Sequence, residues 1–133
     1  MGTKAGALAA ASVEPLVMRA DGAGFSARSV AGDVDLQDLD NAMRSLMWRL
    51  VGIERDGPGL EQAVGRLATW HHLVSQRVFG DPAGWVLVNK MLVGWLIARS
   101  ALARQESRGT HYRRDYPEPD EANWLRDLDV ARP

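Results

Sequence analysis

The stretch that decides the fold is DPAGWVLVNKMLVGWLIARSALARQES, residues 81–107. Asp81 suits the cap of a helix, Pro82 suits its first position, and Gly109 follows as a stop. A helix that is apolar nearly all round is buried by neighbours on more than one flank. We therefore predict a central helix from about Pro82 to Ser107. Its apolar residues, which fall on several sides, are Trp85, Leu87, Val88, Met91, Leu92, Trp95, Leu96, Ala98 and Leu102.

A second helix is predicted upstream, from about Asp35 to Val51. Asp35 is placed to cap its first amides, and Gly52 to end it in a left-handed conformation. The apolar residues recur at offsets of three and four, which puts them on one face. They are Leu36, Leu39, Met43, Leu46, Met47 and Leu50.

Between these two helices, the turn formed by residues 56–59 leads into another helix that ends near Arg77, with Pro58 in its first turn. Leu60, Val64, Leu67, His71 and Val74 line one of its faces. After Gly109, prolines predict an extended segment and then a short helix over about Asp120 to Leu128, with Trp124 and Leu125 packed back on the other helices. We find no internal repeat and no alternating strand pattern.

The predicted fold class is all-α: a three-helix bundle with the up-down-up course of a spectrin repeat, plus a short C-terminal helix. Residues 1–33 are rich in Gly and Ala and have no sustained periodicity, which predicts a flexible arm or linker. The helical domain is assigned to residues 34–133.

Composition excludes several classes of protein. The 133 residues include no cysteine, which excludes a disulfide scaffold, a thiolate metal site and a cysteine nucleophile. The formal net charge of −1 argues against a general nucleic-acid binder. The strongly apolar run from Met91 to Ala98 is far below the roughly 20 residues of a membrane span. We read no targeting signal, and we expect a cytoplasmic protein without a membrane span.

No motif predicts catalysis by this chain. Gly22 and Gly24 form a Gly-x-Gly, but no strand precedes them and the third glycine of a nucleotide fingerprint is missing. His71 and His72 are adjacent on a helix and point about 100° apart, so they cannot hold one metal ion together. The tryptophans at helical spacing are predicted to fill the core. We therefore expect no catalytic residue, no metal ligand and no cofactor bound by this chain.

One segment stands apart, because charged and aromatic side chains crowd the point where the long apolar helix gives way to an extended run. It is compatible with a solvated loop in which Arg104 and Arg108 complement the negative end of the helix dipole. It is equally compatible with a loop that docks onto an acidic or phosphate-bearing surface. The candidate docking residues are Glu106, Ser107, Arg108, Gly109, His111, Arg113, Asp115, Tyr116 and Pro117.

These nine residues resemble the signature in the C-terminal domain of L-aspartate oxidases and of succinate dehydrogenase and fumarate reductase flavoproteins. The tail residues Asp120, Asn123, Trp124 and Leu125 extend the likeness. Upstream, residues 46–48, 51–55 and 59–63 are similar to a run of the aspartate oxidases. Arg114 departs from the acidic residue often found at its position. The resemblance covers roughly residues 36–128 in order.

The resemblance implies a structural and docking domain of an FAD-dependent oxidoreductase. In that family FAD lies in a separate domain, which would partner this chain in cis or in trans. Within the family we favour L-aspartate oxidase, which converts aspartate to iminoaspartate in NAD biosynthesis. The alternatives are a succinate dehydrogenase or fumarate reductase subunit and a free-standing protein-interaction bundle. A nucleic-acid-binding role is the weakest hypothesis, since acidic residues interleave the basic ones, and the oligomeric state is left open. The basic residues are Lys90, Arg99, Arg104, Arg108, Arg113 and Arg114.

Overall fold

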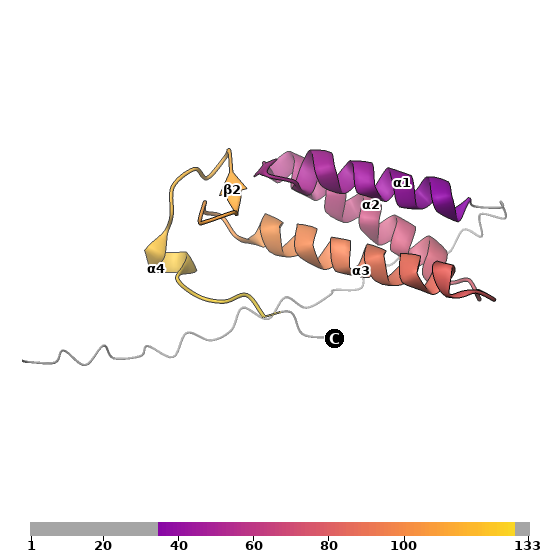
Figure 1. Cartoon of the computed structure of the whole chain (residues 1–133). Coiled ribbons are helices and arrows are strands. Elements are labelled where there is room, and N and C mark those ends of the chain that lie inside the picture. The colour runs from indigo at the N-terminus through magenta and orange to yellow at the C-terminus, as the bar shows by residue number, and fades with distance from the viewer. Residues whose placement is uncertain (1–34, 130–133) are drawn as a thin grey trace, which may run out of the picture.

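Three long helices lie side by side in the computed structural model, which describes residues 35–129 (Figure 1). They are α1 (Leu36–Leu46), α2 (Gly57–Ser75) and α3 (Pro82–Ala103), and consecutive helices run in opposite directions. A short helix, α4 (Glu121–Trp124), follows near the C-terminus. The predicted all-α class is confirmed. The arm predicted for residues 1–33 lies outside the described residues.

Local capping explains where the long helices begin. The carboxylates of Asp35, Asp56 and Asp81 each accept hydrogen bonds from backbone amides in the first turn of the helix that follows. Such amides have no partner within the helix, so an aspartate at this position stabilises the helix start. Pro58 and Pro82 occupy first-turn positions, where the lack of an N–H costs nothing. The predicted helix starts are confirmed.

The predicted end of the first helix was wrong in its geometry. From Met47 to Val51 the backbone changes to a π-helix, η1. Gly52 has a φ of −64°, which is not the left-handed conformation that we predicted. A Cβ at Gly52 would instead lie 2.4 Å from the carbonyl oxygen of Trp48. Glycine is needed at this position because the chain passes so close to its own backbone.

The end of α3 was also predicted one turn too late. The helix stops at Ala103, and Arg104 is extended with φ −77° and ψ 108°. Gly109 has a positive φ of 57°, but it shapes a turn within the following loop. Residues 104–107 therefore belong to the loop, where the side chains of Arg104, Glu106 and Ser107 bind polar partners.

The core lies between the three helices, and α2 and α3 make its most extensive contact. Gly94 brings α1 close to α3, since a Cβ there would lie 2.9 Å from the Met43 methyl carbon. The buried apolar side chains of the core come from all three helices and η1. They are Leu39, Met43, Leu46, Val51, Leu60, Ala63, Leu67, Val74, Leu87, Met91, Ala98 and Ala101.

α3 contacts both α1 and α2, but one face of this apolar helix is uncovered. Val86, Val93 and Ile97 are 49%, 54% and 49% exposed. Trp85 and Trp48, which we expected in the core, are also exposed. In the described part of the chain, α3 is the one helix whose length and apolarity would suffice to cross a membrane, a measure that the core helix of a soluble protein also meets.

A two-stranded parallel sheet was not predicted. Strand β1 (Glu54–Arg55) pairs with β2 (Tyr112–Arg113), and Arg114 N–H donates to the Arg55 carbonyl at 2.9 Å. Two residues per strand are too few to show an alternating pattern in the sequence. The pair ties the loop after α3 to the chain just before α2.

The C-terminal helix is shorter than predicted. It ends at Trp124, and Leu125 is 68% exposed instead of packed on the other helices. Trp124 itself is partly buried, with the guanidinium groups of Arg104 and Arg126 over its ring at 5.7 and 5.3 Å. The indole therefore packs mainly between arginines.

Candidate functional site

Arg113 is the centre of the loop that follows α3. Its side chain is 2% exposed, although arginine is seldom fully buried without partners. Nη1 donates to the carbonyl oxygens of Ala101, Leu102 and Arg104 at 2.9, 3.0 and 3.2 Å. These carbonyls end α3 and have few partners within the helix. One guanidinium thus supplies hydrogen bonds to the free carbonyl groups at the C-terminus of α3, and its positive charge complements the helix dipole.

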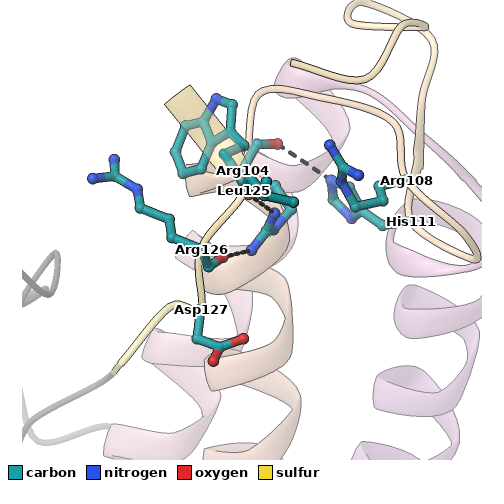
Figure 2. Close-up of a pocket in the computed structure, with 7 residues that line it drawn as sticks. Arg104, Arg108, His111, Leu125, Arg126 and Asp127 are labelled. Carbon is teal, nitrogen blue, oxygen red and sulfur yellow. Dashed lines mark hydrogen bonds between the residues drawn. The ribbon is translucent and has the colours of Figure 1, made fainter. Parts of the chain in front are cut away.

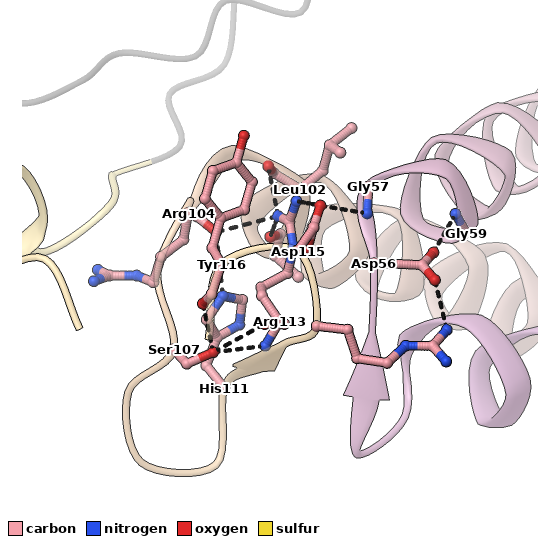
Figure 3. Close-up of polar contacts among 12 residues, drawn as sticks. Asp56, Gly57, Gly59, Leu102, Arg104, Ser107, His111, Arg113, Asp115 and Tyr116 are labelled. Atoms are coloured by element: carbon pink, nitrogen blue, oxygen red, sulfur yellow. Dashed lines mark hydrogen bonds and ion pairs between the residues drawn. The ribbon is translucent and has the colours of Figure 1, made fainter. Parts of the chain in front are cut away.

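Asp115 joins the same cation to the start of α2 (Figure 3). Its oxygens accept from Arg113 Nε at 2.8 Å and Nη2 at 2.7 Å, which is a two-armed ion pair. Oδ2 also accepts from the Gly57 N–H at 2.9 Å, in the first turn of α2. The hydrogen bonds from Arg113 lower the pKa of Asp115 to about 2, against the effect of burial. The carboxylate therefore stays charged at neutral pH.

Glu106 forms a second buried centre. Its side chain is 0% exposed and accepts hydrogen bonds from Arg104 at 2.6 Å and from Arg108 at 3.1 Å. The backbone N–H of Asp120 adds a third donor at 2.9 Å. The Arg108 hydrogen bonds, with those from Asp120 and Arg104, lower the pKa of Glu106 to about 2 although burial acts to raise it. The carboxylate therefore ties the chain before α4 to the end of α3.

Ser107 closes the loop between these centres. Its hydroxyl accepts from the Arg113 N–H at 2.8 Å and donates to the Tyr116 carbonyl at 2.7 Å. Gly109 makes the turn through which Arg108 and His111 exchange two backbone hydrogen bonds. The loop is thereby held by its own polar groups.

The nine predicted docking residues therefore divide into three sets by their exposure. Glu106, Ser107 and Arg113 are buried and bind other parts of this chain. Arg108 and His111 are partly buried, and both have partners within the domain. The exposed members are Gly109, Asp115, Tyr116 and Pro117. The structure thus brings all nine together in one loop, whose outer surface remains available for contact.

Several of the basic residues considered for nucleic-acid binding have acidic partners. Arg113 and Arg108 pair as described, and Lys90 binds Asp40 at 3.0 Å. Arg114 pairs with Asp56, so the departure from the family's acidic residue leaves a local ion pair in place. These ion pairs neutralise much of the positive charge that a nucleic-acid-binding surface would need.

His111 sits between Arg55 and the end of α3. Its Nδ1 lies 3.2 Å from Arg55 Nη1, and its Nε2 lies 3.2 Å from the Arg104 carbonyl oxygen. Both contacts are satisfied only by the neutral tautomer, in which Nε2 donates and Nδ1 accepts. Burial lowers the pKa of His111, and the nearby charges of Arg55, Arg113 and Arg104 lower it further. The imidazole is therefore held neutral in a positively charged setting.

Two adjoining hollows open beside His111, each with a volume of about 440 Å³. Both are lined by His111 and Arg104. The first hollow is also lined by Arg108 and Arg126 and by the apolar side chains of Trp124 and Leu125. The second hollow is also lined by Arg55. Figure 2 shows Arg108 and His111 together on one side of the first hollow, while the Arg126 side chain extends away on the other.

No His, Asp or Glu cluster with the three members needed to hold a metal ion occurs within residues 35–129. Sequence reasoning missed Arg55, whose side chain reaches His111 from 56 positions away. One feature of the sequence did point to this contact: residues 51–55 and the loop both resemble the same family, in the same order along the chain. Segments that share a motif in this way are candidates for contact.

The comparisons identify relatives of this arrangement. Residues 40–130 match the family model described as "Fumarate reductase flavoprotein C-term". An FAD-dependent oxidoreductase of Methanocaldococcus jannaschii is 36% identical over 97 residues, 70% of this chain and 18% of the relative. An L-aspartate oxidase of Acinetobacter baylyi is 38% identical over 88 residues, 64% of this chain and 16% of the relative.

A solved structure of a related protein also resembles this chain. A chain of the Mycobacterium smegmatis Sdh1 complex in the apo form matches with a TM-score of 0.59 and 36% identity. The match covers 71% of this chain and 17% of that one. The chain spans less than a fifth of the length of each of these three relatives. It belongs to the family of C-terminal domains found in the fumarate reductase, succinate dehydrogenase and L-aspartate oxidase flavoproteins.

Proposed function

We propose that this chain is the helical docking domain of an FAD-dependent oxidoreductase of the L-aspartate oxidase kind. FAD and the reacting groups belong to a separate flavin domain, which this chain contacts in cis or in trans. The whole enzyme then oxidises aspartate to iminoaspartate, a step of NAD biosynthesis in the cytoplasm. The 38% identity to the Acinetobacter L-aspartate oxidase supports this branch.

The observation that carries the proposal is the uncovered apolar face of α3. Val86, Val93 and Ile97 recur at helical spacing and leave about half of each side chain in contact with solvent. Between them and α1 runs a groove floored by Gly94 and bordered by Met43. Large exposed apolar patches on soluble domains mark interaction sites, because their burial against a partner is favourable.

The loop after α3 supplies polar contacts at the C-terminal end of the same helix. Glu106 and Arg113 fix its shape from within, so its outer side chains are presented in a set geometry. Asp115, Tyr116 and Pro117 are exposed and lie on that outer surface. An apolar centre with a polar border is the usual anatomy of a protein interface.

A chimeric enzyme tests the proposal. The matching part of this chain replaces its counterpart in the Acinetobacter L-aspartate oxidase. We expect the purified chimera to retain FAD and to oxidise aspartate. Val93→Glu in the same chimera places a charge on the apolar face, and we expect loss of FAD retention and of activity.

Gln62→Glu is the matched control, since it adds the same charge at an exposed position of α2. We expect it to behave as the parent chimera. Equal loss in both variants, or full activity with Val93→Glu, would contradict docking through α3. A chimera that works only in a fumarate reductase or succinate dehydrogenase flavoprotein would favour that branch. Failure in every flavoprotein context would favour a free-standing interaction bundle.

A further inference from the structure

The two hollows beside His111 carry more positive than negative charge. Arg104 and Arg108 share the single carboxylate of Glu106. Arg113 is matched by Asp115, whereas Arg55 makes no ion pair with any carboxylate in residues 35–129. Arg126 and Asp127, which also line the first hollow, offset each other in charge. Arg108 also lies in the field of Glu121, so the charge left unmatched at the hollows is that of Arg55.

Arg55 is the most informative of these residues. It donates to His111 and to the carbonyl oxygen of Thr110, both neutral partners. Its Nε is buried and has no hydrogen-bond partner. A buried donor without an acceptor is costly, and a charged one more so. Arg55 also lines the second hollow, where a bound anion would offset the positive charge of its side chain.

The hollows also have room and a suitable wall. Arg55 and His111 line the second hollow beside Ile97 and Leu128, and Arg108 lines the first beside Trp124. The guanidinium fork matches the oxygens of phosphate and carboxylate groups better than a point charge does. Apolar side chains around such donors exclude water and strengthen the electrostatic attraction.

We propose that the two hollows form one binding site for a small oxyanion, a phosphate or a carboxylate group, held by Arg55 and Arg108 beside His111. The site does not depend on the proposed flavin domain, since every residue in it belongs to this chain. The anion offsets the charge of Arg55, which no carboxylate in residues 35–129 matches.

Calorimetric titration of the 133-residue chain with inorganic phosphate, and separately with succinate, tests the site at low ionic strength. We expect saturable binding of at least one probe, and the tighter probe assigns the ligand as a phosphate or a carboxylate. Arg55→Gln should weaken binding by about tenfold or more, the loss typical for one charge-assisted contact. Arg66→Gln removes the same charge from the exposed side of α2 and should leave binding unchanged.

A second measurement needs no variant. The charged groups that act on His111 are Arg55 on β1, Arg113 on β2 and Arg104 at the end of α3, and Arg108 lines the first hollow with it. An anion among them favours the imidazolium, so saturating phosphate or succinate should raise the His111 pKa in an NMR titration. No saturable binding of either probe, equal weakening by Arg66→Gln, or a His111 pKa that saturating anion leaves unmoved would each overturn the proposal.

Discussion

Arg113 and Asp115 form a two-armed ion pair that connects the end of one helix to the start of another. The arginine binds the last carbonyls of α3, and the aspartate binds the first free amide of α2. The two helix ends carry opposite partial charges, and each meets the side chain of complementary sign. This pair thereby ties the loop to the ends of both helices.

Removal of Arg113 should destabilise the domain strongly. Arg113→Met keeps much of the side-chain volume but leaves the α3 carbonyls and Asp115 without their partner. Each buried carbonyl left without its donor costs about 1–3 kcal/mol. We expect a loss of this size in urea unfolding followed by circular dichroism.

Arg114→Met is the matched control for this experiment. Arg114 lies next in the chain, but its side chain is 59% exposed. Exposed ion pairs contribute little to stability because water and salt screen them. If the two variants unfold at the same urea concentration, Arg113 is not the centre of the loop.

Acid should unfold the domain through Glu106. Its folded pKa of about 2 lies below its ordinary value of 4.5, so the folded state binds the proton more weakly than the unfolded state. The stabilisation is complete above pH 4.5 and is lost as the pH falls toward 2. Glu106→Gln should be less stable than the parent at pH 7, and this difference should shrink across that range.

Unfolding midpoints measured at several pH values between 7 and 2 would show this behaviour. Glu61→Gln, at an exposed position of α2, is the control and should track the parent. A constant gap between parent and Glu106→Gln at every pH would contradict the pKa of Glu106 as the cause.

His111 should titrate below the ordinary histidine pKa of 6.5. The folded state holds the neutral ring, because burial and the surrounding arginines disfavour the imidazolium. Its contribution to stability is therefore complete above pH 6.5 and declines as the pH falls below it. NMR of the ring protons measures the midpoint directly, and a His111 pKa above 6.5 would exclude the hydrogen bond in which Nδ1 accepts from Arg55.

Helix starts could be predicted because their cause is local. Asp35, Asp56 and Asp81 cap the amides within a few positions of themselves, and a proline follows two of them directly or closely. The end of α3 could not be predicted in the same way. It is set by Arg113, which binds the Ala101 carbonyl from twelve positions further along the chain.

The site was predicted as a set of residues but not as an arrangement. The motif located the loop, yet nothing local indicates that Glu106 faces inward while Tyr116 faces outward. Arg55 meets His111 only after β1 and β2 pair, which depends on the whole fold. Periodicity likewise identified α3 as apolar on many sides, but it does not say whether this chain or a partner covers Val93.

Two glycine substitutions should change stability in opposite directions. Gly84 is buried in the first turn of α3, where a Cβ would lie 2.1 Å from a ring carbon of Phe79. Gly84→Ala must displace that ring and its edge-on contact with Trp85, whose ring centre lies 5.6 Å away. Such overpacking costs about 1–3 kcal/mol, which outweighs the gain of up to about 1 kcal/mol from helix propensity.

Gly65 lies on an exposed part of α2, and a Cβ there would meet no atom within 4 Å. Gly65→Ala should therefore stabilise the domain by up to about 1 kcal/mol. Urea unfolding of both variants measures the contrast, and stabilisation by Gly84→Ala equal to that by Gly65→Ala would mean that Phe79 does not pack on α3.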